Sequence, residues 1–143
     1  VGEQGRVVSY ELRPGHREQA LVNVESFFGK IPDRLEIRDG DVRDAGLRSD
    51  RFDRVVLDLP EPWTPLETLH AVLEPGAVLC AYLPTTIQVQ QLVLALPGSG
   101  FLHIETFELL KRGWHVTERS VRPDHRMVGH TGFLTLARVV PPD

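Results

Sequence analysis

The chain has 143 residues, of which 41% are hydrophobic and 25% charged, a balance typical of one globular domain. Its formal charge of −4 argues against a protein that coats nucleic acid through bulk attraction, because phosphate binding needs clustered Lys and Arg. Its apolar stretches are too short to cross a bilayer and it has no recognisable leader, so we expect a cytoplasmic protein.

The first part of the chain predicts a strand, a helix and two further strands. RVVSYEL favours a strand that ends near Glu11. Residues 13–29 place apolar side chains at helical spacing, with Pro14 suited to the first turn and Gly29 to the end. LEIRDGDV predicts a strand that breaks at residues 39–41, and RFDRVVLDLPEPW predicts a strand that runs into a proline-rich break.

The second part predicts a short helix over residues 65–73 and then AVLCAYL, an apolar run typical of a parallel strand buried on both faces. Cys80 in this run has no partner for a disulfide, and we interpret it as a small core residue. TTIQVQQLVLALPG predicts a helix that ends at Pro97. HIETFELL and GFLTLARVV both predict strands without a clear helix between them, which favours an antiparallel ending. Without an internal repeat or linker, we expect a single domain over residues 1–143.

This alternation predicts an α/β fold with a mostly parallel sheet, in which ligands bind at the carboxyl ends of the strands. Three carboxylates close apolar strands there: Glu11, Asp41 and Asp58. Glu11 could accept hydrogen bonds from ribose hydroxyls, or could be a solvated acid at a strand end. Asp41 could accept from an adenine amino group, or could bond its own backbone in a turn.

The segment LDLPEPW is more informative than either acid. Pro60 and Pro62 stiffen the backbone directly after a strand and hold Asp58 and Trp63 at the edge of the sheet. Such placement suits a reacting carboxylate. The alternative is a proline turn in which Trp63 serves packing.

Residues 111–126, KRGWHVTERSVRPDHR, form a local basic stretch on an acidic chain. The three histidines near the C-terminal end could be mistaken for a metal set. No two of them show the i, i+4 helical spacing of a zinc motif, so we predict no metal site for His115, His125 and His130.

The order of the motifs resembles the tRNA adenine-N1 methyltransferases that modify the T-loop adenosine. The motifs are an acid after the first strand, GDV, DLPEPW, YLPTT, RGWHV and RPDHRMVGHTGFL, and they cover essentially the whole chain. The resemblance implies a class I methyltransferase (Rossmann-like) fold, S-adenosylmethionine as methyl donor, tRNA as substrate and usually a tetrameric assembly.

The resemblance also implies roles for single residues. Glu11 would bind the cofactor ribose, Asp41 with Val42 would border the cofactor adenine, and Asp58 would face both the methyl group and the target base as the catalytic carboxylate. The border of the target-base pocket would come from Tyr82, Leu83 and Pro84. Further contacts on the RNA side are implied for Arg112, His115, His130 and Thr131.

The sequence departs from the family because it does not contain the glycine-rich EAGTGSG-like loop or the strand before it. We therefore expect a sheet without the strand between VVSYE and VVLDL, and poor folding as a monomer. A stable chain would need a second copy in the gap, or direct pairing of these two strands.

The implied function is methylation of adenine N1 in tRNA, as part of a longer enzyme. Two alternatives remain open. The first is a non-catalytic tRNA-binding or assembly subunit, and the second is a methyltransferase that acts on a protein or a small molecule.

Overall fold

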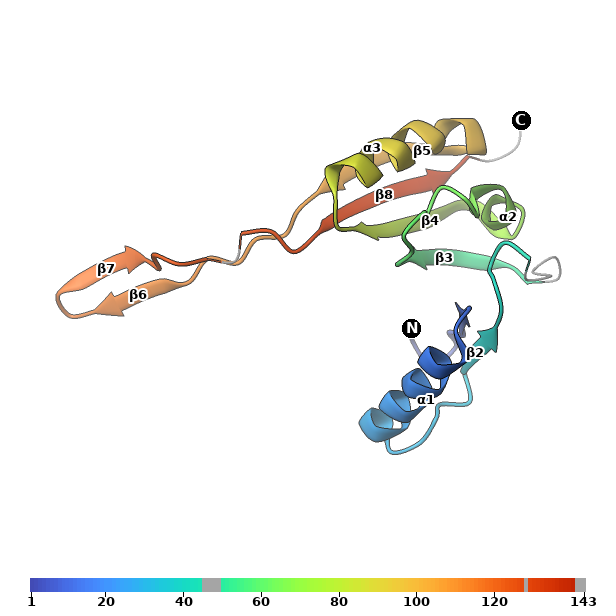
Figure 1. The fold of residues 1–143 in the computed structure, drawn as a ribbon, viewed down its shortest axis with the longest axis horizontal. Coiled ribbons are helices and arrows are strands. Elements are labelled where there is room, and N and C mark those ends of the chain that lie inside the picture. Colours follow the sequence, from blue (N-terminus) through green and yellow to red (C-terminus); the bar gives the residue numbers. More distant parts are fainter. Residues whose placement is uncertain (45–49, 128, 141–143) are drawn as a thin grey trace. The chain divides into compact units, whose positions relative to one another are not determined.

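A computed structural model describes residues 1–44, 50–127 and 129–140 of the protein (Figure 1). The chain divides into two compact units, Val1–Leu47 and Arg48–Asp143. Each unit contains a sheet of its own. The expectation of one domain over residues 1–143 stays a prediction.

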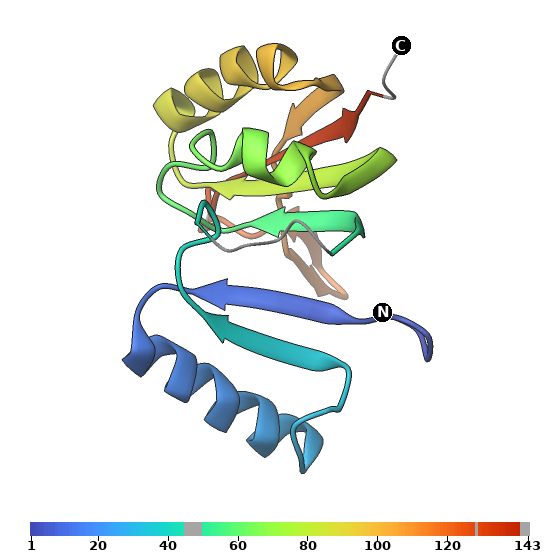
Figure 2. The ribbon, with the colours of Figure 1, turned by 90° about the vertical axis from the view of Figure 1, so that its right-hand side faces the viewer.

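The first unit is a strand, a helix and a second strand: β1 (Val7–Glu11), α1 (Pro14–Phe28) and β2 (Leu35–Asp39). β1 and β2 pair in parallel, from Val7 with Leu35 to Glu11 with Asp39, so both strands end at one edge (Figure 2). As predicted, the helix begins at Pro14 and ends at Gly29, whose φ of 75° favours glycine. These elements confirm the pattern expected from the sequence.

The first unit has little core of its own. None of its described residues is buried, and Val22, Phe27 and Phe28 on α1 are exposed. The helix is tied to β2 through Arg17, whose Nε donates to the carbonyl oxygen of Ile37 at 2.9 Å. The stability of the first unit thus depends on covering the apolar surface that its own helix and strands leave exposed.

The second unit holds a four-stranded sheet in the order β3-β4-β8-β5. Its strands are β3 (Phe52–Leu57), β4 (Leu73–Leu83), β8 (Phe133–Val139) and β5 (Phe101–Phe107). β3 runs parallel to β4, and β8 runs antiparallel to both β4 and β5. β8 alone therefore opposes the common direction of the other three. This arrangement confirms the predicted mostly parallel sheet with an antiparallel C-terminal strand.

One face of this sheet is packed against helices. The buried side chains of β4 alternate along the strand, and α3 (Thr86–Ala95) packs against β4 and β8. The helix α2 (Leu66–His70) contributes Leu66 and Leu69 to the buried set. A 3-10 turn, η2 (Pro97–Ser99), follows α3 and leads into β5. Figure 2 shows α2 and α3 beside the sheet.

The opposite face of the sheet is incompletely covered. Cys80 is half-buried, Tyr82 is exposed, and Val56 on β3 is 74% exposed. Partial burial raises the pKa of the Cys80 thiol. The expectation that AVLCAYL is buried on both faces is thus wrong for this chain, because α2 and α3 pack on one face only.

Two further differences concern element boundaries. The helix predicted to reach Leu73 ends at His70, and Leu73 instead begins β4 because it pairs with Phe52, ahead of an irregularity in the ladder between Phe52 and Arg54. The amide of Phe52 also donates to the carbonyl oxygen of Val72 at 3.0 Å. Pairing with a neighbouring strand thus overrides the local helical pattern.

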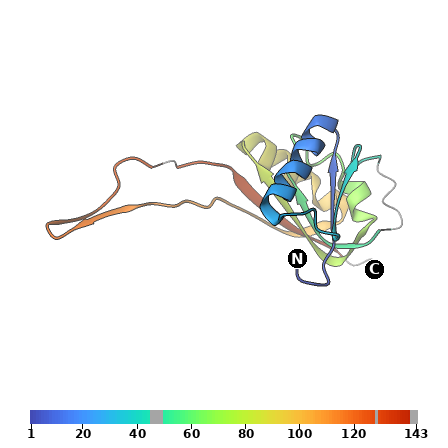
Figure 3. The same ribbon diagram turned by 90° about the horizontal axis from the view of Figure 1, so that it is seen from below.

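A hairpin that the sequence did not predict follows β5. It consists of β6 (Trp114–Thr117) and β7 (Ser120–Pro123), which pair antiparallel. Figures 1 and 3 show it beyond the ends of β5 and β8. Because side chains alternate between the faces of a strand, one face carries Trp114, Val116, Val121 and Pro123, and the other carries His115, Thr117, Ser120 and Arg122. The hairpin is therefore apolar on one face and polar on the other.

Each sheet has an edge that no other described strand pairs with. Among the described strands, β1 pairs with β2 alone and β3 pairs with β4 alone. Within the described residues, no helix is both long enough and apolar enough to cross a membrane.

Candidate functional site

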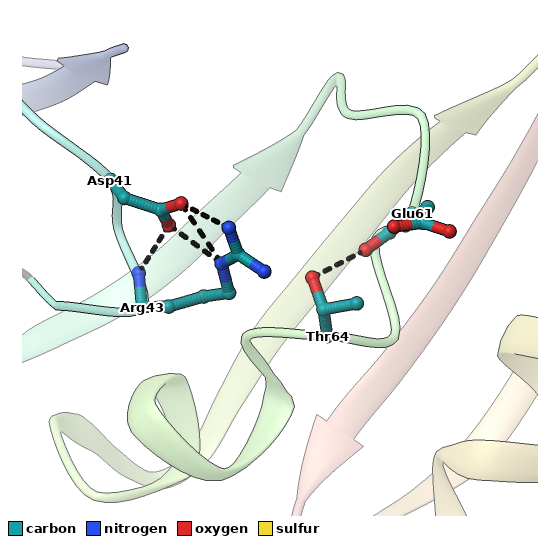
Figure 4. A network of polar contacts seen from close by, with 4 residues as sticks. All are labelled: Asp41, Arg43, Glu61 and Thr64. Carbon is teal, nitrogen blue, oxygen red and sulfur yellow. Dashed lines mark hydrogen bonds and ion pairs between the residues drawn. The ribbon is translucent and has the colours of Figure 1, made fainter.

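Asp58 lies directly after β3, at the carboxyl end of the strand, and is exposed. The loop after it is held by prolines, since Pro62 and Pro65 are fully buried. Within the loop, the hydroxyl of Thr64 donates to the carbonyl oxygen of Glu61 at 2.9 Å (Figure 4). The amide of Thr64 donates to the same oxygen at 3.1 Å. The loop thus combines a fixed backbone with an exposed carboxylate at its start.

Gln88 on α3 joins this loop to the end of β4. Its Nε2 donates to the carbonyl oxygen of Pro60 at 2.9 Å. Its Oε1 accepts from the hydroxyl of Thr85 at 2.6 Å, and Thr85 is the N-cap of α3. The motifs DLPEPW and YLPTT are therefore linked through one side chain.

Tyr82, near the end of β4, contacts the GHT motif. Its hydroxyl donates to the carbonyl oxygen of Thr131. A Cβ atom at Gly132, which is buried, would lie 2.4 Å from the ring of Tyr82. Glycine at this position therefore allows the ring to approach the backbone closely.

His130 connects two further segments. Its Nδ1 lies 2.7 Å from Oε1 of Glu108, its Nε2 lies 3.1 Å from the carbonyl oxygen of Pro84, and its ring contacts that of Phe133 at 4.8 Å between centroids. The Glu108 carboxylate, followed by the Pro84 carbonyl, raises the pKa of His130. Both partners are acceptors, so the protonated imidazolium satisfies both.

The structure therefore brings together four of the residues predicted on the substrate side: Tyr82, Pro84, His130 and Thr131. Leu83 lies between two of them, but its side chain is fully buried. A hollow of about 220 Å³ adjoins this group and is lined by Thr86, Val89, Thr106, Phe107, Glu108 and Phe133. It is smaller than the usual pocket for an organic ligand.

Arg112 and His115 lie elsewhere. Arg112 precedes β6, and His115 sits on the polar face of the hairpin opposite Arg122. Both are exposed, and within the described part of the chain no hydrogen bond or ion pair joins either of them to the group around Tyr82. The RGWHV motif is thus part of the hairpin.

Glu11, in the first unit, has one carboxylate oxygen, Oε1, that accepts hydrogen bonds from Arg13. The backbone amide of Arg13 donates to Oε1 at 2.9 Å, and this hydrogen bond lowers the pKa of Glu11. No described residue bonds Oε2, so that oxygen can accept from a ligand. The amide of Gly40 donates to the carbonyl oxygen of Glu11 at 3.2 Å, which fixes the strand end.

Asp41 caps its own turn. Its Oδ1 accepts from the amide of Arg43 at 2.8 Å, and both carboxylate oxygens contact the Arg43 guanidinium (Figure 4). These contacts lower the pKa of Asp41 to about 2. The turn interpretation of Asp41 is therefore observed, Val42 beside it is half-buried, and the contact of both residues with adenine stays a prediction.

Among the residues that the structure describes, no group of three or more His, Cys, Asp or Glu side chains is arranged to hold a metal ion.

Comparison with known protein families identifies the family of this chain. The profile of the family described as tRNA methyltransferase complex GCD14 subunit matches residues 1–122. The chain belongs to this GCD14 family.

Two curated relatives support this assignment. The tRNA (adenine(58)-N(1))-methyltransferase TrmI of Thermus thermophilus is 40% identical over 138 residues, covering 96% of this chain and 53% of the relative. The tRNA (adenine(57)-N(1)/adenine(58)-N(1))-methyltransferase TrmI of Methanocaldococcus jannaschii is 34% identical over 99% of this chain and 58% of the relative. This GCD14-family chain thus spans about half the length of the curated relatives it matches.

Solved structures agree with the family assignment. A SAM-dependent O-methyltransferase from Thermotoga maritima superposes with a TM-score of 0.90 at 31% identity, over 100% of this chain and 53% of that one. The tRNA (m1A58) methyltransferase TrmI from Aquifex aeolicus gives a TM-score of 0.86 at 28% identity, over 96% and 54%. These likenesses confirm the predicted class I methyltransferase fold of the GCD14-family chain.

Sequence reasoning missed Gln88, Glu108 and the hairpin. For Gln88 a signal was present, because Thr85 and Gln88 form the Thr-x-x-Gln pattern of a helix N-terminus. For the hairpin, WHVT and SVRP alternate in polarity around a short turn. Glu108 gives no local signal, since its partner His130 lies far along the chain.

Proposed function

We propose that this chain takes part, within a longer protein, in the S-adenosylmethionine-dependent methylation of adenine N1 in the T-loop of tRNA. The observation that carries the proposal is the meeting of three motifs in the second unit. DLPEPW, YLPTT and GHT are joined there by hydrogen bonds of Gln88, Tyr82 and His130. The family membership supports the same conclusion.

Asp58 is the proposed catalytic carboxylate. Adenine N1 has a lone pair and needs no base to become nucleophilic, so alignment of the reactants is the main task of the protein. Methylation places positive charge on the adenine ring. The exposed carboxylate of Asp58 would stabilise this charge and accept a hydrogen bond from the exocyclic amine.

The cofactor contacts are proposed for Glu11, Asp41, Val42 and Asp58. Glu11 fits a ribose because its Oε2 is able to accept from a hydroxyl, and its side chain is 29% exposed. Asp41 keeps acceptor capacity beside Arg43, since a carboxylate has about four lone-pair sites. When bound, S-adenosylmethionine supplies the methyl group as an electrophile.

The substrate contacts are proposed at two places. Tyr82, Leu83 and Pro84, with His130 and Thr131, would border the target base, which must leave the RNA stack to be reached. Arg112 and His115 would contact the tRNA backbone from the hairpin, where Arg122 adds charge on the same polar face as His115. A tRNA substrate also favours a cytoplasmic enzyme.

We also propose a homo-oligomer, a tetramer by family resemblance. The apolar face of the hairpin supports this assembly, because Trp114, Val116 and Val121 are exposed there. A two-stranded hairpin is marginal in water unless another surface covers it. The solution mass of the full-length parent, compared with that of its Val116→Lys variant, tests the proposal. Equal masses for both proteins would remove the hairpin from the assembly.

The test of the function is a methylation assay with the full-length parent. The purified protein is incubated with unmodified tRNA transcripts and S-adenosylmethionine, and the digested RNA is analysed for 1-methyladenosine by mass spectrometry. We expect one modified adenosine in the T-loop. Binding of tRNA without methylation would support the non-catalytic alternative, and methylation of a protein or small molecule instead would support the other.

A further inference from the structure

We propose that Gln88 is a positioning residue, which sets the location of Asp58 through its hydrogen bond to the carbonyl oxygen of Pro60. Gln88 lies on α3 and is half-buried. The proposal rests on the proposed function, because it assigns Gln88 a role in the same methyl transfer.

The first argument concerns the hydrogen-bond partners of the Gln88 side chain. In a capping box, the Gln at the third helical position reaches back to the backbone amide of the N-cap residue. Thr85 and Gln88 have this spacing, and the hydroxyl of Thr85 accepts from the amide of Gln88 at 3.3 Å. The amide group of Gln88 is directed differently, with Oε1 on the Thr85 hydroxyl and Nε2 on the Pro60 carbonyl. One half of the side chain therefore serves the helix and the other half serves the loop.

The second argument is that the backbone of the loop is stiff enough for a hydrogen bond at Pro60 to restrict the position of Asp58. Pro60 and Pro62 have their φ angles fixed by the pyrrolidine ring. Pro62 is also fully buried, so the far side of this short segment cannot move freely. A bond at the Pro60 carbonyl therefore restricts the backbone between β3 and Pro62, and Asp58 is the first residue of that stretch.

The third argument is the position of α3. Thr85 follows Pro84, whose carbonyl accepts from His130, and Tyr82 contacts Thr131. Gln88 therefore fixes the loop that carries Asp58 relative to the segment proposed to border the target base. Alignment between these two segments is what methyl transfer requires.

The decisive variant is Gln88→Glu in the full-length parent. Glutamate keeps the length of the side chain and can complete an ordinary capping box, and its charge suits a helix N-terminus. It cannot donate to the Pro60 carbonyl. We expect unchanged or increased thermal stability, together with a kcat for tRNA methylation that is about tenfold lower and a cofactor affinity within about twofold. A purely structural role for Gln88 predicts no such separation.

Two further variants control for charge and for the helix. Gln88→Met removes the donor without adding charge and should also lower kcat. Gln90→Glu adds the same charge to an exposed position of the same helix and should leave kcat unchanged. Loss of activity in Gln90→Glu equal to that in Gln88→Glu would overturn the proposal.

A second measurement does not depend on activity. Amide hydrogen exchange in the full-length parent should be faster over residues 58–64 in Gln88→Glu and Gln88→Met than in the parent and in Gln90→Glu. If the parent methylates no tRNA, the proposed function fails and the exchange rates alone decide whether Gln88 anchors the loop. Parent-like exchange in both Gln88 variants would overturn the inference even if tRNA methylation is observed.

Discussion

His130 and Glu108 form an ion pair in which Nδ1 of the imidazole lies 2.7 Å from Oε1 of the carboxylate. The pair joins the end of β5 to the segment that leads into β8. The same imidazole bonds Pro84, so a single ring holds three parts of the second unit together.

The ion pair predicts a pH dependence of stability. The folded state raises the pKa of His130 above its unfolded value, so the stabilisation is complete below the unfolded value of about 6.5 and is lost as pH rises through the higher folded value. Denaturant unfolding of the full-length parent and of His130→Gln at several pH values checks this. The stability difference between them should shrink as pH rises. A difference that is constant with pH would contradict the ion pair.

The same relationship can be tested by titration. Glu108→Gln should lower the pKa of His130 in an NMR titration, because the carboxylate is the largest cause of the shift. Glu105→Gln, an exposed acid on β5, is the control and should leave the titration unchanged.

Replacement of Asp58 should affect the chemical step. Asp58→Ala in the full-length parent should lower the methylation rate by about tenfold or more while cofactor affinity stays within a few-fold, because charge stabilisation acts in the transition state. Single-turnover methylation and a cofactor-binding titration measure the two effects. Asp53→Ala serves as control, because Asp53 is an exposed acid on β3 itself. Parent-like rates for Asp58→Ala would exclude it from the mechanism.

The strands and helices of the two units were largely predictable from local sequence. Strand residues alternate, Pro14 and Gly29 bound α1, and the proline break marks the end of β3. The family motifs likewise pointed to Tyr82, Pro84, His130 and Thr131, which the fold brings together.

What local sequence could not provide are bonds between distant segments. The link from Gln88 to Pro60 and the link from His130 to Glu108 join residues with no common periodicity. The start of β4 at Leu73 was missed for a similar reason, since pairing with Phe52 rather than local propensity decides it.

Replacement of Glu11 should affect cofactor binding. Glu11→Ala in the full-length parent should weaken S-adenosylmethionine binding by about tenfold or more, because hydrogen bonds to a charged acceptor are among the stronger ones. Calorimetry gives the affinity directly. Glu25→Ala, an exposed acid on α1, is the control. Unchanged affinity in Glu11→Ala would mean that the residue is a solvated acid.

Gly132→Ala should disturb the contact with Tyr82. Its Cβ would lie 2.4 Å from the ring, so we expect a loss of about 1 kcal/mol in the free energy of unfolding. The loss should be smaller in a Tyr82→Ala background, because the clash is then absent, and a double-mutant cycle measures this coupling. Gly129→Ala meets only an ordinary contact and should be neutral. Additive effects of Gly132→Ala and Tyr82→Ala would contradict the proposed clash.

The 143-residue chain by itself should self-associate. β3 has an unpaired edge among the described strands, and Val56 exposes an apolar side chain next to it. Light scattering should give a mass above that of the monomer, and Val56→Lys should lower it. Leu94→Lys on α3, where the replaced side chain is equally exposed, is the matched control and should leave the mass unchanged. A monomeric mass for the unsubstituted 143-residue chain would contradict this expectation.

The two faces of β4 differ in which part of the protein restricts the side chains that can occupy them. Leu79 and Ala81 are enclosed by the second unit itself, so the packing that restricts them is already encoded in this chain. Val78 and Cys80 point to the half-open face, where any restriction depends on what another segment or subunit places against them. Variation at alternate positions of one strand therefore reports on two different selective pressures, one from this chain's own packing and one from its surroundings.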